Sequence, residues 1–252
     1  MHHRVKQKFY YLFWRNNLLD QFFYASEIYD DKVILPEEEA HHALVVLRKH
    51  KGDPLQVVDG KGNLYNCILD SVDPENCNLH IIDKQEKYDA VKHYIHIGLS
   101  PPKSHDRVEW FVEKATEIGV QEITFIQTQH SERVMIKPKR ILKRIIASMK
   151  QSLKATLPVI NDIIPLSEFI EASEEENKFV GYLGEEDSPL LSKIANPGER
   201  YSVLIGPEGD YSPNEIAEVK DFGFKPVSLG RSRLRTETAG VAACHILNII
   251  NE

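Results

Sequence analysis

The sequence predicts an α/β protein with two domains: a small β-rich domain over residues 21–90 and a mostly parallel α/β domain over residues 91–252. Before residue 90, short runs of alternating apolar residues surround one amphipathic helix, which is typical of a small β-domain. After residue 90, runs with strand periodicity and runs with helix periodicity alternate. That order indicates a mostly parallel sheet with helices on both faces.

Composition limits the classes of function. The chain has 252 residues, an apolar fraction of 42% and a formal net charge of −7, so any contact with nucleic acid must come from a local basic patch. The three cysteines are far apart and form no CxxC pair, which fits a reducing cytoplasm and predicts no metal site. No apolar run is long enough to span a membrane. Residues 1–20 lack the apolar core and cleavage site of a signal peptide, and we interpret them as an N-terminal extension.

One helix is predicted in the first domain, between Pro36 and Gly52. Glutamates fill its first turn and basic residues fill its last turn, in agreement with the helix dipole. A hairpin over residues 55–68 and a strand at residues 79–82 follow. The buried stripe of the helix is expected to contain Ala40, Ala43, Leu44 and Leu47.

The second domain shows alternating strands and helices. The predicted strands are 95–99, 122–127, 178–183, 201–205 and 226–229, and the predicted helices are 104–119, 137–154, 212–223 and 239–250. An acidic run, Glu168–Glu176, is interpreted as a solvated surface between elements. In the helix 137–154 the residues expected to face inward are Ile141, Leu142, Ile145, Ile146 and Met149.

A glycine-containing loop, Gly206-Pro207-Glu208-Gly209, follows one of these strands and precedes a helix that Ser212 and Glu215 open as a capping box. Open α/β sheets bind ligands at this position, just past the carboxyl end of a strand. Glu208 would repel phosphate but would accept hydrogen bonds from hydroxyl or ammonium groups. From this loop alone, a ligand site and a plain tight turn remain equally open.

Basic side chains gather in two further places. Arg231, Arg233 and Arg235 alternate after the strand 226–229, with Glu237 next in phase, so an extended segment would point them together toward phosphates or bases. The helix 137–154 carries many basic residues on an otherwise acidic chain, which suits either an RNA-backbone track or solubility alone.

Five short motifs occur together in this chain. They are His42–Arg48 with Gly52-Asp53, Glu113–Val120, Gln151-Ser152 with Pro158, Ile205–Gly209 and Leu234–Ala239. With these motifs the chain resembles the bacterial 16S ribosomal RNA uridine-N3 methyltransferases of the SPOUT class over about residues 21–250. Departures from the family pattern occur at Asp210, Arg231, Ser232, Arg233, Lys150 and Lys154.

The resemblance implies a PUA-like N-terminal β-barrel and a trefoil-knotted C-terminal domain that binds S-adenosylmethionine. It implies a cytoplasmic homodimer that acts on 16S ribosomal RNA, within the small ribosomal subunit, without metal. Arg235 is expected to stabilise negative charge on the uracil carbonyls, and Glu237 either accepts the N3 proton or orients Arg235. The residues expected to hold the cofactor are Leu183, Gly206, Pro207, Glu208, Gly209, Leu229, Gly230 and Leu234. Those expected to bind RNA are Arg48, Lys49, Arg133, Arg140, Arg144, Gln151, Lys154, Arg231 and Arg233.

Two other functions stay open: a related SPOUT enzyme that methylates a ribose 2′-hydroxyl, and a non-catalytic RNA-binding protein. A nucleotide-dependent oxidoreductase is disfavoured, because the chain has no GxGxxG followed by a ribose-binding acid. The target nucleotide, and whether free RNA or an assembled subunit is modified, are not encoded in these patterns.

Overall fold

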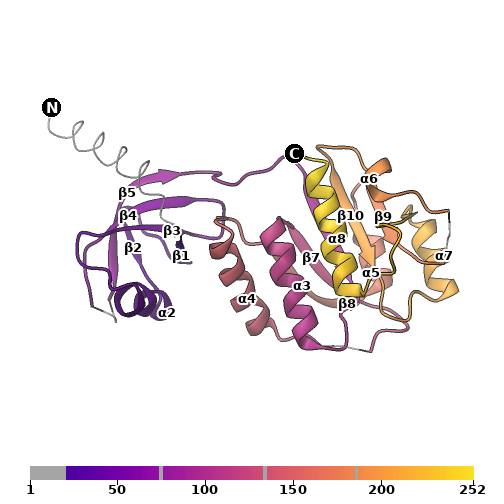
Figure 1. Cartoon of the computed structure of the whole chain (residues 1–252), viewed down its shortest axis with the longest axis horizontal. Coiled ribbons are helices and arrows are strands. Elements are labelled where there is room, and N and C mark those ends of the chain that lie inside the picture. Colours follow the sequence, from indigo (N-terminus) through magenta and orange to yellow (C-terminus); the bar gives the residue numbers. More distant parts are fainter. Residues whose placement is uncertain (1–20, 74–75, 133–134, 185–186) are drawn as a thin grey trace. The chain divides into compact units, whose positions relative to one another are not determined.

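The computed structural model describes residues 21–73, 76–132, 135–184 and 187–252, and the expected extension of residues 1–20 lies outside them (Figure 1). The described residues form two compact units. One runs up to Ala90 and also takes in Met149–Thr156; the other holds Val91–Ser148 and Leu157–Glu252. Each unit is described by itself below.

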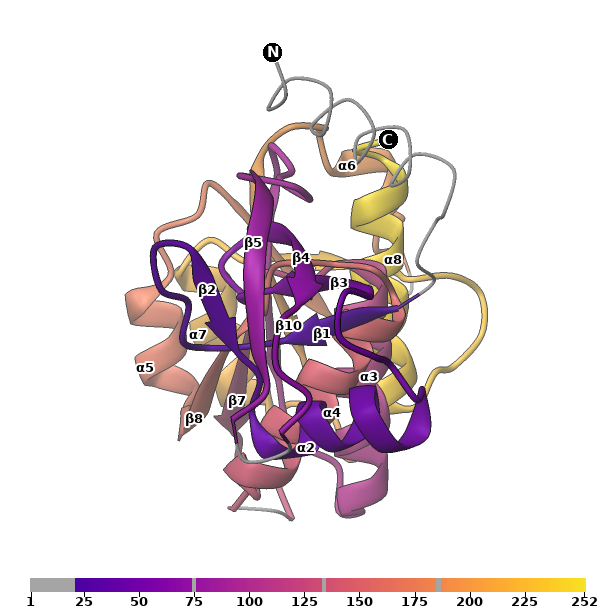
Figure 2. The same cartoon turned by 90° about the vertical axis from the view of Figure 1, so that its left-hand side faces the viewer.

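The first unit is built on a five-stranded sheet with the order β1-β3-β4-β5-β2 (Figure 2). β1 and β3 pair in parallel, and the other neighbours are antiparallel. The predicted hairpin is confirmed as β3 and β4, and the carboxylate of Asp59 closes its turn by accepting from the backbone N–H groups of Lys61 and Asn63. The strands are β1 (Phe22–Tyr24), β2 (Lys32–Ile34), β3 (Pro54–Val58), β4 (Leu64–Leu69) and β5 (Asn78–Gln85).

The helix of this unit is shorter than the sequence predicts. An α-helical turn, α2 (Glu37–His41), runs into a π-helical turn, η1 (His42–Val46), and the basic residues after it do not continue the helix. The wider turn is closed by a hydrogen bond from the N–H of Leu47 to the carbonyl of His42, 3.0 Å long. Because a π-turn holds more residues than an α-turn, it rotates Leu47 away from the predicted buried stripe, and Leu47 is exposed while Ala40 and Ala43 are buried.

A distant segment completes the first unit, which no pattern in the sequence indicated. Thr156 forms β-bridges with Gly60 and Lys61 in the hairpin turn. The carboxylate of Asp89 accepts hydrogen bonds from the N–H groups of Ala155 and Thr156, at 2.8 and 3.0 Å. The chain therefore returns to this unit long after leaving it.

The second unit contains a six-stranded sheet with the order β11-β9-β10-β6-β7-β8, in which every pair of neighbours is parallel. This confirms the predicted parallel sheet. The strands are β6 (Tyr94–Leu99), β7 (Glu122–Gln127), β8 (Val159–Pro165), β9 (Asn177–Gly181), β10 (Arg200–Ile205) and β11 (Lys225–Val227).

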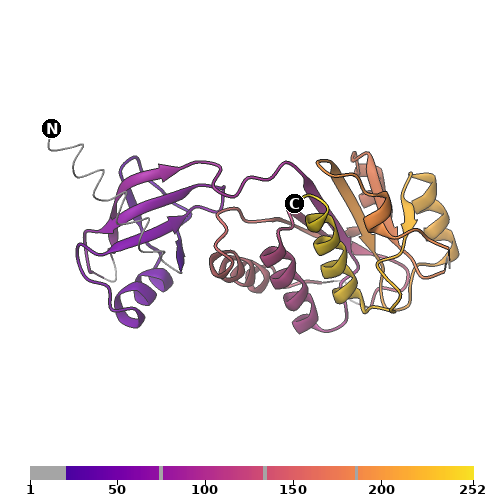
Figure 3. The ribbon, with the colours of Figure 1, turned by 45° about the horizontal axis from the view of Figure 1, so that its top comes forward.

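Helices cover both faces of this sheet. One apolar core joins the sheet to α3 (His105–Ile118), α4 (Pro138–Gln151), α6 (Leu191–Ile194) and α8 (Thr236–Ile249), and Figure 3 shows α3, α4 and α8 side by side. A second core on the opposite face joins it to α5 (Leu166–Ala172) and α7 (Pro213–Asp221). Successive side chains of β10 point to opposite faces of the sheet and so contribute to both cores. Tyr201 and Val203 belong to the first core and Leu204 to the second.

The last connection determines where the ends of the strands meet. β11 lies at the edge of the sheet, yet α8 packs against β6 and β10 in its middle. The segment between them must therefore pass the carboxyl ends of β9 and β10.

Two interpretations of the second unit were wrong in part. β8 and α5 were not predicted, and the acidic run Glu168–Glu176 is not a plain surface, because Phe169 and Ile170 within it are buried against the sheet. Leu142 was expected to face inward but is exposed, whereas Ile141, Ile145 and Met149 are buried. A helix covered on one side only buries a narrower stripe than apolar spacing suggests.

Glu175, at the end of that acidic run, belongs to a polar cluster under α5. Its side chain is only 9% exposed, and its Oε1 lies 3.8 Å from Nδ1 of His96 on β6. The imidazole also reaches the hydroxyl of Thr124, at 2.7 Å. The interaction with His96 is the main cause that holds the pKa of Glu175 below its ordinary value of 4.5.

We expect Glu175→Gln to lower the free energy of unfolding by about 1–2 kcal/mol at neutral pH. A carboxyl group whose pKa is lower in the folded state stabilises the fold above its unfolded pKa, and that contribution is lost as the pH falls through the folded pKa. The difference between the two proteins should therefore shrink below pH 4.5. Urea unfolding at several pH values measures it, with the exposed neighbour Glu174→Gln as control. A difference that is constant with pH would contradict the assignment.

No helix among the described residues combines the length and the apolar character needed to cross a membrane.

Candidate functional site

A cavity of about 360 Å³ opens where three strands of the second unit end. Its walls are the residues that follow β9 (Gly181–Leu183), those that follow β10 (Ile205–Pro207) and the segment from Val227 to Thr236 before α8. Carboxyl ends of parallel strands meet at one edge of the sheet, which is why loops far apart in sequence surround one space. The volume is that of a site for a small molecule or cofactor.

Gly206 brings two of these walls together. A Cβ atom at this position would lie 2.8 Å from Cε2 of Tyr211, whose ring is buried. The hydroxyl of Thr236, at the start of α8, donates a 3.0 Å hydrogen bond to the carbonyl of Gly206. Only glycine lets the loop after β10 pass between the tyrosine ring and α8.

The next residues hold the loop in place. Asp210 has a φ of 61°, in the left-handed region that favours glycine. Its Oδ2 accepts from the N–H of Leu183, at 3.3 Å, and so joins the walls after β9 and β10. The predicted capping box of Ser212 and Glu215 is confirmed at the start of α7. Burial raises the pKa of the Tyr211 phenol well above its ordinary value, so this ring stays neutral.

Most of the residues expected to hold a cofactor lie around this one cavity. Gly209 is not part of the described lining and faces His130 instead. A Cβ atom added at Gly209 would lie 3.3 Å from the Cβ of His130. Asp210, Thr236 and Tyr182 also line the cavity and were not anticipated. The expected residues that do line it are Leu183, Gly206, Pro207, Glu208, Leu229, Gly230 and Leu234.

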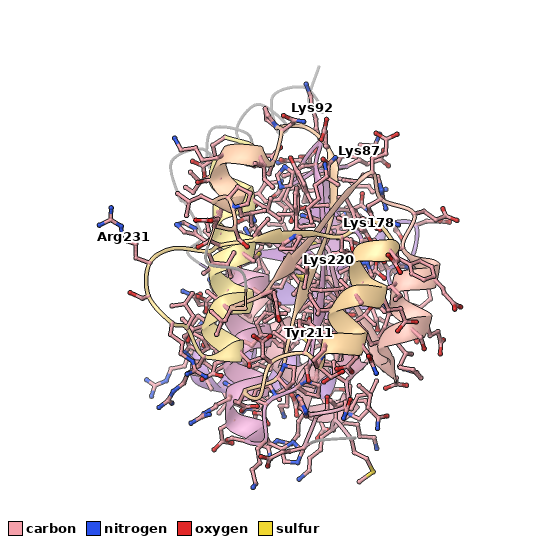
Figure 4. All side chains as sticks on the ribbon, turned by 90° about the vertical axis from the view of Figure 1, so that its right-hand side faces the viewer. Lys87, Lys92, Lys178, Tyr211, Lys220 and Arg231 are labelled. Atoms are coloured by element: carbon pink, nitrogen blue, oxygen red, sulfur yellow. The ribbon has the colours of Figure 1, made fainter. Side chains whose placement is uncertain are left out.

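The three alternating arginines do not point together. Arg233 and Arg235 line the cavity, whereas Arg231 projects away from the segment before α8 (Figure 4). The alternation argument was wrong because residues 229–235 do not form a strand, and Gly230, with a φ of 137°, turns the chain. Two of the three arginines, Arg233 and Arg235, therefore belong to the cavity wall.

Glu237 does not contact the arginine that it was expected to orient. Its carboxylate is buried in the first turn of α8, outside the described lining of the cavity, and its ion partner is Arg107 of α3. Nε of Arg107 lies 3.6 Å from Oε1 of Glu237, and Nη1 lies 4.0 Å from Oε1 of Glu208. Sequence reasoning missed Arg107, because both of its partners lie far away in the sequence.

The other expected RNA-binding residues are not among the described residues that line this cavity. In α4, Arg140 and Arg144 form ion pairs with Glu109 on α3, and Arg144 also with Glu113, so part of their charge is neutralised. Arg48 and Lys49 follow η1 in the first unit, where Gln151 and Lys154 also belong. Arg133 lies outside the described residues.

Comparison with known proteins gives the same family for both units. A sequence model described as an RNA methyltransferase domain matches residues 90–248, and one described as an RNA methyltransferase PUA domain matches residues 35–82. Ribosomal RNA small subunit methyltransferase E of Aquifex aeolicus is 32% identical over 235 residues, covering 89% of this chain and 97% of that protein. Its namesake in Bacillus subtilis is 25% identical over 231 residues, covering 85% and 89%.

Solved structures agree. A probable rRNA-methyltransferase from Porphyromonas gingivalis matches with a TM-score of 0.87 and 38% identity, covering 92% of this chain and 98% of the other. A ribosomal RNA small subunit methyltransferase E from Neisseria gonorrhoeae, solved bound to S-adenosyl methionine, matches with a TM-score of 0.82 and 26% identity, covering 92% and 98%.

These likenesses confirm the expected fold class, a SPOUT-type α/β domain after a small PUA-like β-domain. The first sequence model matches more than half of the chain, and the Aquifex protein aligns along most of it. The chain therefore belongs to the RNA methyltransferase family.

Proposed function

We propose that the chain transfers a methyl group from S-adenosylmethionine to N3 of a specific uridine in 16S ribosomal RNA. The observation that carries this proposal is the cavity at the strand ends, which combines the two predicted loops with Arg235 at its wall. Membership of the RNA methyltransferase family and the names of the relatives from Aquifex and Neisseria support the substrate and the cofactor.

The residues around the cavity fit S-adenosylmethionine. Leu183, Leu229 and Leu234 offer apolar walls for an adenine ring, and the carboxylates of Glu208 and Asp210 suit a cationic ligand. When bound, this cofactor supplies a methyl group already activated on a sulfonium. The protein therefore needs to align the uracil and to manage one proton.

That proton sits on N3 of uridine, which is a poor nucleophile until the proton leaves. The base must be unpaired or flipped out for N3 to be reached. Arg235 would donate hydrogen bonds to a uracil carbonyl, where negative charge develops as N3 loses its proton. Glu208 lines the cavity and Glu237 does not, so we assign proton acceptance to Glu208.

The finer partners are part of the same proposal. Arg233 at the cavity wall, Arg231 beside it and the basic residues Arg48 and Lys49 would contact the RNA backbone of the small ribosomal subunit in the cytoplasm. A homodimer is supported by Trp110, a large apolar side chain that is 41% exposed on α3, the helix that packs against α8. Sedimentation equilibrium tests it, and a monomer mass at micromolar concentration would reject it.

The proposal is tested on its natural substrate. Small ribosomal subunits, and free 16S RNA, from a strain that lacks the protein are incubated with it and isotope-labelled cofactor. We expect nucleoside mass spectrometry to find 3-methyluridine at one position. A 2′-O-methylated nucleoside would instead favour the ribose methyltransferase, and no label with either RNA, together with no calorimetric binding of the cofactor, would favour a non-catalytic RNA-binding protein.

A further inference from the structure

Three charged side chains from three separate elements converge beside the cavity: Arg107 from α3, Glu208 from the loop after β10 and Glu237 from α8. We propose that Arg107 is a positioning residue, which holds the carboxylate of Glu208 in place as the acceptor for the uracil N3–H and thereby makes the site select uracil over cytosine. This inference rests on the proposed function, since it concerns the base that enters the site.

Glu237 is the buried partner that holds Arg107 in place. Its side chain is only 8% exposed, and its Oε2 is buried without a hydrogen-bond partner among the described residues. A buried carboxylate is unfavourable unless a cation lies close to it, and the guanidinium of Arg107 supplies that cation, with its Nε 3.6 Å from Oε1. The start of α8 adds the favourable end of a helix dipole. Arg107 is therefore drawn toward a site that Glu237 defines.

Glu208 is the partly exposed partner of Arg107. Its side chain is 44% exposed and lines the cavity, and that of Arg107 is 39% exposed, so both reach solvent. Their 4.0 Å separation is within ion-pair range but too long for a hydrogen bond. The guanidinium can therefore orient the carboxylate of Glu208 without occupying its oxygen atoms, which remain able to accept a hydrogen bond from a ligand.

An ionised acceptor at this place distinguishes the two pyrimidines. Uracil presents an N–H donor at N3 between two carbonyls, whereas cytosine presents a lone pair at N3. A carboxylate accepts from the first and repels the second. Sites built around one hydrogen bond reject an analogue that cannot make it, because the polar group of the protein is then left unpaired.

The test compares Arg107→Met, which keeps the length of the side chain but not its charge, with Arg107→Lys. We expect Arg107→Met to bind S-adenosylmethionine within about threefold of the wild type by calorimetry, with an unchanged KM for RNA. Its kcat should fall by about 30- to 100-fold, because the acceptor is misplaced. Arg107→Lys should recover most of this loss. The matched control is Asp106→Asn, an exposed neighbour in the same helical turn, which should keep wild-type kinetics.

A second pair of measurements separates positioning from a general loss of structure. The methylation rate is measured on RNA with uridine and on RNA with cytidine at the mapped position. Arg107→Met should lower the ratio of the uridine rate to the cytidine rate by about tenfold. Glu208→Gln, which leaves Glu237 and Arg107 paired, should show the same narrowing and the same drop in kcat. A wild-type kcat and ratio in Arg107→Met, or a change in KM alone, would overturn the inference. Failure of the wild type itself to form 3-methyluridine would reject the proposed function instead.

Discussion

Arg235→Ala is expected to slow methyl transfer by about 100- to 1000-fold, the usual effect of removing one donor to a developing oxyanion. Arg235 lines the cavity at the point where the segment from β11 enters α8, and Glu237 is not its ion partner among the described residues. Its guanidinium is therefore available to a substrate carbonyl. The rate is measured by single turnover with labelled cofactor and saturating RNA.

The same variant should bind S-adenosylmethionine within about threefold of the wild type, because the lost interaction belongs to the substrate. Arg231→Ala is the matched control, since Arg231 lies on the same segment but projects away from the cavity (Figure 4). It should weaken RNA binding slightly and leave the single-turnover rate unchanged. Full activity in Arg235→Ala would remove this side chain from the mechanism.

Gly206→Ala is expected to destabilise the protein by about 1–3 kcal/mol through overpacking. The new methyl group would lie 2.8 Å from the buried ring of Tyr211, and Thr236, which binds the carbonyl of Gly206, is buried as well. Relief by shifting the loop would narrow the cavity, so cofactor affinity should also fall by about tenfold or more. Thermal unfolding and calorimetry measure the two effects.

Gly209→Ala provides the comparison, because Gly209 is on the same loop but outside the described lining of the cavity. Its new methyl group would lie 3.3 Å from Cβ of His130, a contact that a small shift relieves. Combining Gly206→Ala with Tyr211→Leu should restore stability in part, since the smaller side chain removes the clash. Equal effects of the two glycine substitutions would show that Tyr211 is not the cause.

Sequence patterns predicted the residues that line the cavity better than the charged residues that converge beside it. Gly206 and Leu229 each follow an apolar strand, and parallel topology alone brings strand ends together. Arg107 could not be found this way, because its neighbours Glu208 and Glu237 are more than a hundred positions away and no periodicity links them. The prediction that the three alternating arginines point together was wrong for a related reason, because alternate residues share a side only when the segment is a strand.

Local geometry explains the other differences. The helix after Pro36 contains a π-turn, and the 3.6-residue period that placed Leu47 inside does not apply beyond it. Glu175 was interpreted as solvated because acidic runs usually are, but its partner His96 comes from a strand that only the folded sheet places nearby. Side chains whose partners lie on distant elements carry no sequence signal of their own.

The return of Met149–Thr156 to the first unit means that this unit is not a continuous stretch of chain. A fragment that stops at Ala90 would lack the backbone that bridges Gly60 and Lys61, and the carboxylate of Asp89 would lose the amides that it binds. Transplanting the unit into another protein would require two pieces, the second taken from the end of α4 and the segment that follows it. A unit made of two separate chain segments cannot be exchanged between proteins as a single gene segment, so we expect the two units to be inherited together.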